Sequence, residues 1–228
     1  MSLLGDTWSY YQDNQATVDA AIRTHVRISA ISIALAAGIG LSLGIVCAKV
    51  GRLTSFLIVT IGNLGRTVPT FAVIALVGIL YTFGPKPAVI GLVALGIPPI
   101  LINTFTGVRD VDPATIEASR GMGLNGFQIL TRVELPLALP LVFAGIRTSA
   151  VQIVATATLA SLIGAGGLGD LVFAGVNNLQ NDVLLVGAIP LALLALLAEL
   201  LFAGAERLST PRGLRIGRRL AIREGRTA

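Results

Sequence analysis

Charged residues are scarce in this sequence. They make up 13% of the 228 residues, where soluble domains average about 25%. Hydrophobic residues make up 54%, and several apolar runs are long enough to cross a bilayer. A chain with so little polar surface cannot cover a water-facing globule. The composition therefore excludes a soluble domain and predicts an all-α integral membrane protein.

Cysteine and histidine each occur once, as Cys47 and His25. One cysteine excludes a disulfide framework and a thiolate metal site within the chain. We interpret Cys47 as a small buried thiol and assign His25 no role. The G-x-x-x-x-G-K-[ST] run of ATP-hydrolysing proteins is also missing. We therefore predict no catalytic, cofactor or metal site in this chain, and any ATP and Mg²⁺ must bind a separate ATPase.

Residues 1–22 contain no lysine or arginine and no apolar run, which excludes a secretory signal. Three aromatic side chains, Trp8, Tyr10 and Tyr11, favour an interfacial N-terminal lead-in at headgroup level. A mobile terminus is the alternative. We place the transmembrane domain at residues 23–206 and a basic cytosolic tail, with seven arginines, at residues 207–228.

The apolar runs predict five spans, at residues 26–48, 53–83, 88–106, 137–163 and 184–202. The second run has 31 residues and is interrupted by Gly62, Gly65 and Pro69, so a six-span version would split it. Its first part, residues 53–64, would cover only about 18 Å of the ~30 Å core. We therefore favour five spans, with the third broken at Pro98-Pro99.

Small residues recur every four positions in the first span, at Ala36, Gly40 and Gly44. This spacing allows close approach of a neighbouring helix, and we interpret it as packing within the chain.

Basic residues give the orientation. With five spans, twelve of the seventeen lysines and arginines fall on the side that holds residues 112–124 and the tail. The positive-inside rule places that side in the cytosol and the N-terminus outside.

A few polar residues lie within the predicted spans. Arg66 is costly at depth and suggests a cavity-facing group, although it could instead lie near an interface or pair with a neighbour. Arg147 can snorkel toward the cytosolic interface, and Glu199 is expected to reach the interface near the end of its span. As residues that line a translocation pathway we nominate Arg66, Thr67, Pro69, Thr70, Asn103 and Thr156.

The most polar interior segment begins at Asp112. Asp112 suits a helix N-cap and Pro113 the first helical position, so a short helix should follow and end near Gly121 or Gly123. Ala114, Ala118 and Gly121 fall on one side of that helix, which makes the side small and smooth. A surface loop helix that joins two spans is the plain alternative.

Residues 164–169, Gly-Ala-Gly-Gly-Leu-Gly, fit the G-x-G-x-x-G pattern. A dinucleotide fold would need a preceding strand and an acid about twenty residues later, and neither is present. We reject nucleotide binding. The glycines instead predict a tight external connection or gate formed by Gly164, Gly166, Gly167 and Gly169, with Asp170 placed to cap the next helix.

Glu117-Ala-Ser119, then Gly123, Val133 and Leu135-Pro136, resembles the E-A-A loop of ABC-importer permeases. Family members usually carry Ala and Ile where this chain has Ser119 and Val133. Over residues 23–206 the chain resembles the osmoprotectant branch of that family. The segments that carry this resemblance are Thr67-Val-Pro-Thr70, Val111-Asp-Pro-Ala114, Glu117-Ala-Ser-Arg-Gly-Met-Gly123, Val133-Glu-Leu-Pro-Leu-Ala-Leu-Pro140, Ala144-Gly-Ile-Arg-Thr148 and Leu162-Ile-Gly-Ala-Gly-Gly-Leu-Gly-Asp170.

The resemblance implies a methionine-permease-like fold and a non-enzymatic transport subunit of the cell membrane. It implies two ATPase subunits, a second permease (identical or paralogous) and an external substrate-binding protein. The segment at 112–124 would be the coupling helix, which switches the pore between inward-open and outward-open states. The implied ATPase-coupling residues are Asp112, Pro113, Glu117, Ala118, Ser119, Gly123, Leu135 and Pro136.

The implied solutes are compatible solutes such as glycine betaine, carnitine, choline or proline betaine. An importer of methionine or another amino acid is the first alternative. An ion-coupled secondary transporter is more distant, because such proteins usually place acids at mid-membrane. A channel would need no coupling helix. The spans show no aromatic cage for a quaternary ammonium group, so we expect the binding protein to set selectivity.

Overall fold

The computed structural model describes residues 3–51, 56, 59–60, 62, 69–80 and 83–209. These residues are almost entirely helical, and no strand occurs among them. The elements are α1 (Leu3–Asp13), α2 (Gln15–Lys49), α4 (Thr70–Leu80), α5 (Pro85–Arg109), α6 (Pro113–Gly121), α7 (Gly126–Ile129), a π-helical segment (Leu130–Glu134), α8 (Leu135–Thr156), a 3₁₀ segment (Ala157–Ile163), α9 (Leu168–Asn177) and α10 (Asn181–Ser209).

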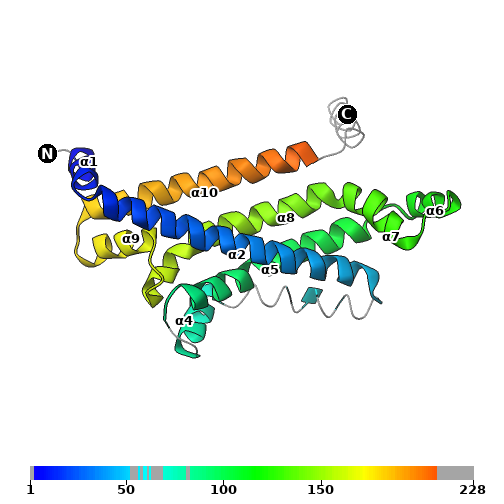
Figure 1. The fold of residues 1–228 in the computed structure, drawn as a ribbon, viewed down its shortest axis with the longest axis horizontal. Coiled ribbons are helices and arrows are strands. Elements are labelled where there is room, and N and C mark those ends of the chain that lie inside the picture. The colour runs from blue at the N-terminus through cyan, green and yellow to red at the C-terminus, as the bar shows by residue number, and fades with distance from the viewer. Residues whose placement is uncertain are drawn as a thin grey trace, which may run out of the picture.

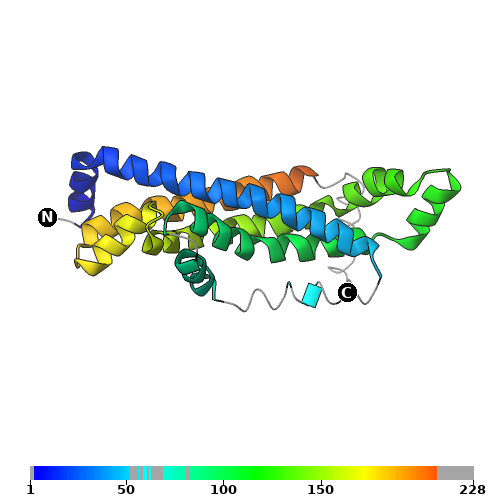
Figure 2. The ribbon, with the colours of Figure 1, turned by 60° about the horizontal axis from the view of Figure 1, so that its bottom comes forward.

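Four long helices, α2, α5, α8 and α10, run side by side and form an elongated bundle (Figures 1 and 2). The helices α6 and α7 project from one end, and α1 and α9 lie at the opposite end (Figure 1). The predicted coupling segment and the C-terminal end of α10 therefore share one end of the bundle, as the charge distribution requires.

Within the described part of the chain, four helical stretches are long and apolar enough to cross a membrane: Gln15–Lys49, Pro85–Arg109, Gly126–Ile163 and Asn181–Ser209. The fifth predicted span, residues 53–83, is only partly described. Its described part includes the short apolar helix α4. The count of five therefore stays a prediction.

Glycines set the spacing between α2 and α5. A Cβ atom on Gly40 would lie 2.9 Å from Cβ of Ile100, and one on Gly44 would lie 2.6 Å from Cβ of Thr104. Ala36, Gly40 and Gly44 are all buried. The predicted small-residue packing within the chain is confirmed.

The helices differ from prediction in two respects, one at a helix start and one inside a helix. The first long helix begins at Gln15 rather than near residue 26, so residues 15–22 belong to α2 and not to a separate lead-in. The predicted break at Pro98-Pro99 is wrong, because α5 is continuous through both prolines. These prolines remove two backbone donors, but both are buried and Ile100 packs against Gly40, so tertiary packing maintains the helix through them.

The helix α1 packs on α10 at the end of the bundle opposite α6. Tyr10 and Tyr11 pack against a buried cluster that contains Val18, Leu171 and Val183. The rings of Trp8 and Tyr11 lie 5.5 Å apart, and Trp8 is 60% exposed. The position of these rings at lipid headgroups stays a prediction.

Candidate functional site

The helix α6 begins as its sequence predicts. Asp112 is the N-cap, and its Oδ1 accepts the backbone N–H of Ala114 at 3.0 Å. Pro113 occupies the first helical position, where its missing N–H costs no hydrogen bond. A cap of this kind stabilises a helix by about 1 kcal/mol, and it fixes where the chain turns after α5.

The C-terminal end of α6 depends on Gly123, whose φ is +84°. The N–H of Gly123 donates to the carbonyl of Arg120 at 2.9 Å, and the N–H of Leu124 donates to that of Ser119 at 3.2 Å. These two bonds form a Schellman motif, which requires a left-handed residue at the position of Gly123. The predicted helix end is confirmed, with the last helical residue at Gly121.

A reciprocal pair of hydrogen bonds starts α7 directly afterwards. Asn125 Oδ1 accepts the N–H of Gln128 at 2.9 Å, and Gln128 Oε1 accepts the N–H of Asn125 at 2.9 Å. This capping box fixes the direction in which the chain leaves α6. The segment from α6 to α7 therefore has a defined shape at both of its turns.

The predicted small side of α6 is exposed. Ala114, Ala118 and Gly121 all face outward, and nothing lies within 4 Å of a Cβ atom placed on Gly121. Beside them, Met122 and Phe127 are each 74% exposed. We call these five residues the docking surface. Apolar side chains exposed on a rigid element are typical of a protein–protein contact.

The other coupling candidates divide between surface and interior. Glu117 is exposed beside the docking surface. Ser119 is only 3% exposed, and its Oγ donates to the carbonyl of Thr115 at 2.7 Å, so it stabilises α6 from inside. Leu135 and Pro136 are half-buried at the start of α8.

An ion pair with one buried member connects this end to the bundle. Glu134, the last residue of the π-helical segment, is 3% exposed, and its carboxylate pairs with the ammonium of Lys49 at the end of α2. Leu135 packs beside them against the buried cluster of Val108, Ala138 and Val142. The end of α2 and the start of α8 are therefore joined by charge as well as by packing. The sequence analysis did not find this pair, because 85 residues separate its members.

The nominated pathway residues are not gathered at one point. Arg66 and Thr67 lie outside the described residues, and Pro69 and Thr70 stand at the start of α4. Asn103 donates to the carbonyl of Pro99 at 2.8 Å and packs at Gly145 of α8. Thr156 lies eleven residues beyond Gly145, about 16 Å further along the helix axis. Asn103 and Thr156 therefore mark different levels of the bundle.

The glycine-rich connection is tight, as predicted. Gly164, Gly166 and Gly167 have φ values of +72°, +77° and +102°. Asp170 was expected to cap the next helix, but the N-cap of α9 is Gly167 and Asp170 lies in the first turn. Asp170 is the third residue of α9, where a carboxylate still interacts favourably with the N-terminal end of the helix.

His25 supports this connection, although the sequence analysis assigned it no role. It is 1% exposed, and its Nε2 donates to the carbonyl of Val154 at 2.9 Å. This carbonyl lies where α8 gives way to the 3₁₀ segment and regular α-helical bonding ends. The same imidazole packs on Gly167, so one buried side chain joins α2, the end of α8 and the glycine turn.

The packing of the glycine turn can be tested by a substitution at Gly169. A methyl group at this position would lie 2.1 Å from the carbonyl oxygen of Thr158. We expect Gly169→Ala to lower the free energy of unfolding by about 3 kcal/mol or more, because a backbone atom cannot move aside. The measurement is the thermal midpoint in detergent. Gly38→Ala, where nothing lies within 4 Å, is the control and should lose no stability; equal midpoints for both variants would contradict the packing.

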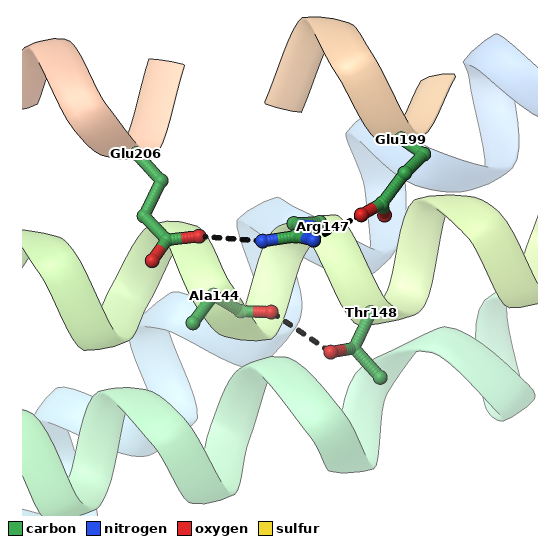
Figure 3. Close-up of polar contacts among 5 residues, drawn as sticks. All are labelled: Ala144, Arg147, Thr148, Glu199 and Glu206. Carbon is green, nitrogen blue, oxygen red and sulfur yellow. Dashed lines mark hydrogen bonds and ion pairs between the residues drawn. The ribbon is translucent and has the colours of Figure 1, made fainter. Parts of the chain in front are cut away.

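Three charged side chains meet between α8 and α10 (Figure 3). The Arg147 guanidinium pairs with Glu199 through Nη2 and with Glu206 through Nη1, the second at 3.2 Å. Arg147 lies twelve residues after Leu135, about 18 Å along α8. Arg147 and Glu199, which were each expected near the interface, therefore belong to one cluster of ion pairs between α8 and α10. Their position at the interface stays a prediction.

Comparison with known proteins gives consistent similarities. Residues 40–212 match the family described as "Binding-protein-dependent transport system inner membrane component". The chain is 39% identical over 210 residues to the carnitine transport permease protein OpuCB of Listeria monocytogenes, an alignment that covers 92% of this chain and 96% of the relative. It is 38% identical over 190 residues to the choline transport system permease protein OpuBB of Bacillus subtilis (strain 168), at 83% and 87% coverage.

Among solved structures, a chain of the inward-facing MetNI methionine ABC transporter aligns with a TM-score of 0.78 and 21% identity. The alignment covers 87% of this chain and 99% of that one. At this identity the likeness shows the fold alone.

Proposed function

Because this chain belongs to the family of binding-protein-dependent transport system inner membrane components, we propose that it imports osmoprotectants as the permease subunit of an ATP-driven transporter. The predicted family, the all-α membrane fold and the inner-membrane location are confirmed. Relatives named for carnitine and for choline transport support solutes that carry a quaternary ammonium group, with glycine betaine and proline betaine in the same chemical class.

The observation that carries the proposal is the docking surface formed by α6, its C-cap Met122 and Phe127 of α7. It is a small apolar surface on a helix with defined caps, joined through α7 and the π-helical segment to α8. Motion of a partner ATPase bound to this surface would be transmitted directly to α8. The Lys49–Glu134 ion pair would transmit it to α2 as well. Closure of two ATPase subunits would then switch the pore from inward-open to outward-open.

The remaining partners follow from this mechanism. One permease subunit makes half of a pore, so a second copy or a paralogue completes it. An external binding protein delivers the solute and supplies the tight recognition. ATP and Mg²⁺ bind the ATPase subunits, and this chain transmits their motion without catalysing hydrolysis.

The test uses the native complex, captured through a tag on this chain and reconstituted in proteoliposomes. We expect ATP-dependent uptake of radiolabelled carnitine, choline or glycine betaine that needs the binding protein. ATP-dependent uptake of methionine alone would favour the amino-acid alternative. Uptake driven by an ion gradient without ATP would favour a secondary transporter, and uptake without any ATPase would favour a channel; either result would overturn the proposal.

A further inference from the structure

The helices α2 and α5 each contain a charge-free segment with one cation at either end. In α2 the cations are Arg27 and Lys49, and in α5 they are Lys86 and Arg109. At 1.5 Å per residue the members of each pair are about 33 Å and 35 Å apart along the helix, which matches the ~30 Å hydrocarbon core. Arg27 and Lys86 are therefore expected at a boundary of the bilayer, at the level of the lipid headgroups.

The two helices run parallel, so their first cations lie on the same side of the membrane. Gly40 packs against Ile100, and Gly44 packs against Thr104 one turn later. Positions at the same level of α2 and α5 therefore differ by sixty in residue number. By the same offset, Arg27 lies level with the first turn of α5.

A cavity of about 550 Å³ lies between α2 and α5 at this level. We call it the cationic cavity, because Arg27 and Lys86 line it and none of its described lining residues is acidic. Both side chains are exposed, and within the described part of the chain neither forms an ion pair. Lys86 also stands in the first turn of α5, where the positive end of the helix repels a cation. A bound anion would relieve this repulsion.

The apolar side chains of the cationic cavity lie deeper in the membrane than its cations. Ile31 follows Arg27 by one helical turn, and Ile90 follows Lys86 by one turn. Both helices run from the headgroup boundary into the hydrocarbon core, so each isoleucine lies about 6 Å below its cation. The two isoleucines are 41% and 49% exposed. The cavity thus combines positive charge at headgroup level with an exposed apolar surface beneath it.

We propose that the cationic cavity binds one anionic phospholipid, with the phosphate at Arg27 and Lys86 and an acyl chain along Ile31 and Ile90. An arginine can bind a phosphate through two parallel N–H···O bonds, and a lysine adds a point charge. A free anion has no tail to cover the isoleucines, and a protein in the external solution does not reach hydrocarbon depth. A zwitterionic lipid fits less well, because its own ammonium group repels the two cations. This site does not depend on which solute the chain transports.

Lipid binding is measured on the full-length chain, purified in detergent and freed of lipid. Phosphatidylglycerol at about ten times its Kd should raise the thermal midpoint by about 3 °C or more. Phosphatidylcholine has the tails without the net charge, and glycerol 1-phosphate has the charge without the tails, so neither should give this shift. No shift with phosphatidylglycerol, or an equal shift with either comparison ligand, would overturn the proposal.

The cationic residues are tested by substitution. Arg27→Gln and Lys86→Gln should each raise the apparent Kd for phosphatidylglycerol about fivefold or more, because each removes a charged donor to the phosphate. Both side chains are exposed and lie on the predicted outer side, so their loss leaves the core intact and strengthens the charge bias that sets orientation. The apparent Kd is obtained from the midpoint shift as a function of lipid concentration.

Arg23→Gln is the matched control, because it removes the same charge one turn away on α2 and does not line the cationic cavity. It should change the apparent Kd less than about twofold. If Arg23→Gln weakened binding as much as Arg27→Gln, the lipid would be held by diffuse surface charge and the proposed site would be wrong. Unchanged binding in both Arg27→Gln and Lys86→Gln would refute it as well.

An acidic surface of the external binding protein is the other occupant that the charge of the cavity allows. If the binding protein raises the thermal midpoint of the lipid-free complex through Arg27 and Lys86, and phosphatidylglycerol does not, the cavity is a protein contact and the proposal fails. No step of the lipid measurement involves transport. A wild-type complex that imports no osmoprotectant would therefore overturn the proposed function and leave the lipid result unchanged.

Discussion

Replacing Gly123 with leucine should abolish ATP-driven uptake while the chain still inserts in the membrane at wild-type level. Gly123 has a φ of +84°, and it closes α6 through its N–H bond to Arg120. A leucine there costs about 1–2 kcal/mol in backbone strain. Unwinding the last turn of α6 would release this strain, and it would displace Gly121 and Met122 of the docking surface.

The measurement for Gly123→Leu is solute uptake in proteoliposomes together with capture of the ATPase on the tagged permease. Gly123→Asn is the matched variant, because asparagine tolerates the left-handed conformation. It should keep most of the uptake. If Gly123→Leu captures the ATPase and transports as the wild type does, the shape of α6 does not determine docking.

Replacing Lys49 with methionine should loosen the attachment of the coupling end to the bundle. It leaves the Glu134 carboxylate, 3% exposed, without its ammonium partner. Breaking a fully buried pair costs about 3–5 kcal/mol. Lys49 is 43% exposed, so we expect a smaller loss of about 2 kcal/mol in the free energy of unfolding. Uptake should fall further than stability, because α2 no longer follows the motion of α8.

The control for Lys49→Met is the double variant Lys49→Met, Glu134→Gln, in which no buried charge is left unpaired. Its thermal midpoint in detergent should recover most of the loss, while its uptake should stay below that of the wild type. If Lys49→Met were as stable and as active as the wild type, the Lys49–Glu134 pair would neither stabilise the fold nor transmit motion between α8 and α2.

The parts of the site that the sequence predicted correctly are those that depend on neighbouring residues. The Asp112 cap, Pro113 in the first turn and Gly123 after the helix each act within three residues of their partners. The same holds for the glycine turn, where the missing side chains themselves permit the positive φ values. Local chemistry decides such features, so they can be inferred before any packing is known.

The prediction failed where packing outweighed local preference. Pro98 and Pro99 are helix breakers in isolation, but both are buried within a continuous α5. The start of the first long helix was placed too late, because residues 15–22 are polar enough to suggest a separate segment, whereas they continue α2 and contribute Val18 to a buried cluster. Asp170 was assigned to a cap that the glycine turn leaves to Gly167.

The sequence by itself determined that this protein lies in a membrane. It also determined how the segment that we propose to contact the ATPase begins and ends. Composition, apolar run length and turn residues act over a few neighbouring positions, so they can be read along the chain. Only the tertiary structure decided which charged and buried polar groups meet. Lys49 with Glu134, His25 with Val154, and Arg147 with Glu199 and Glu206 are 85, 129, 52 and 59 residues apart. Their pairing depends on the way α2, α8 and α10 pack, because in a membrane a charge or buried donor must find its partner on whichever helix lies beside it.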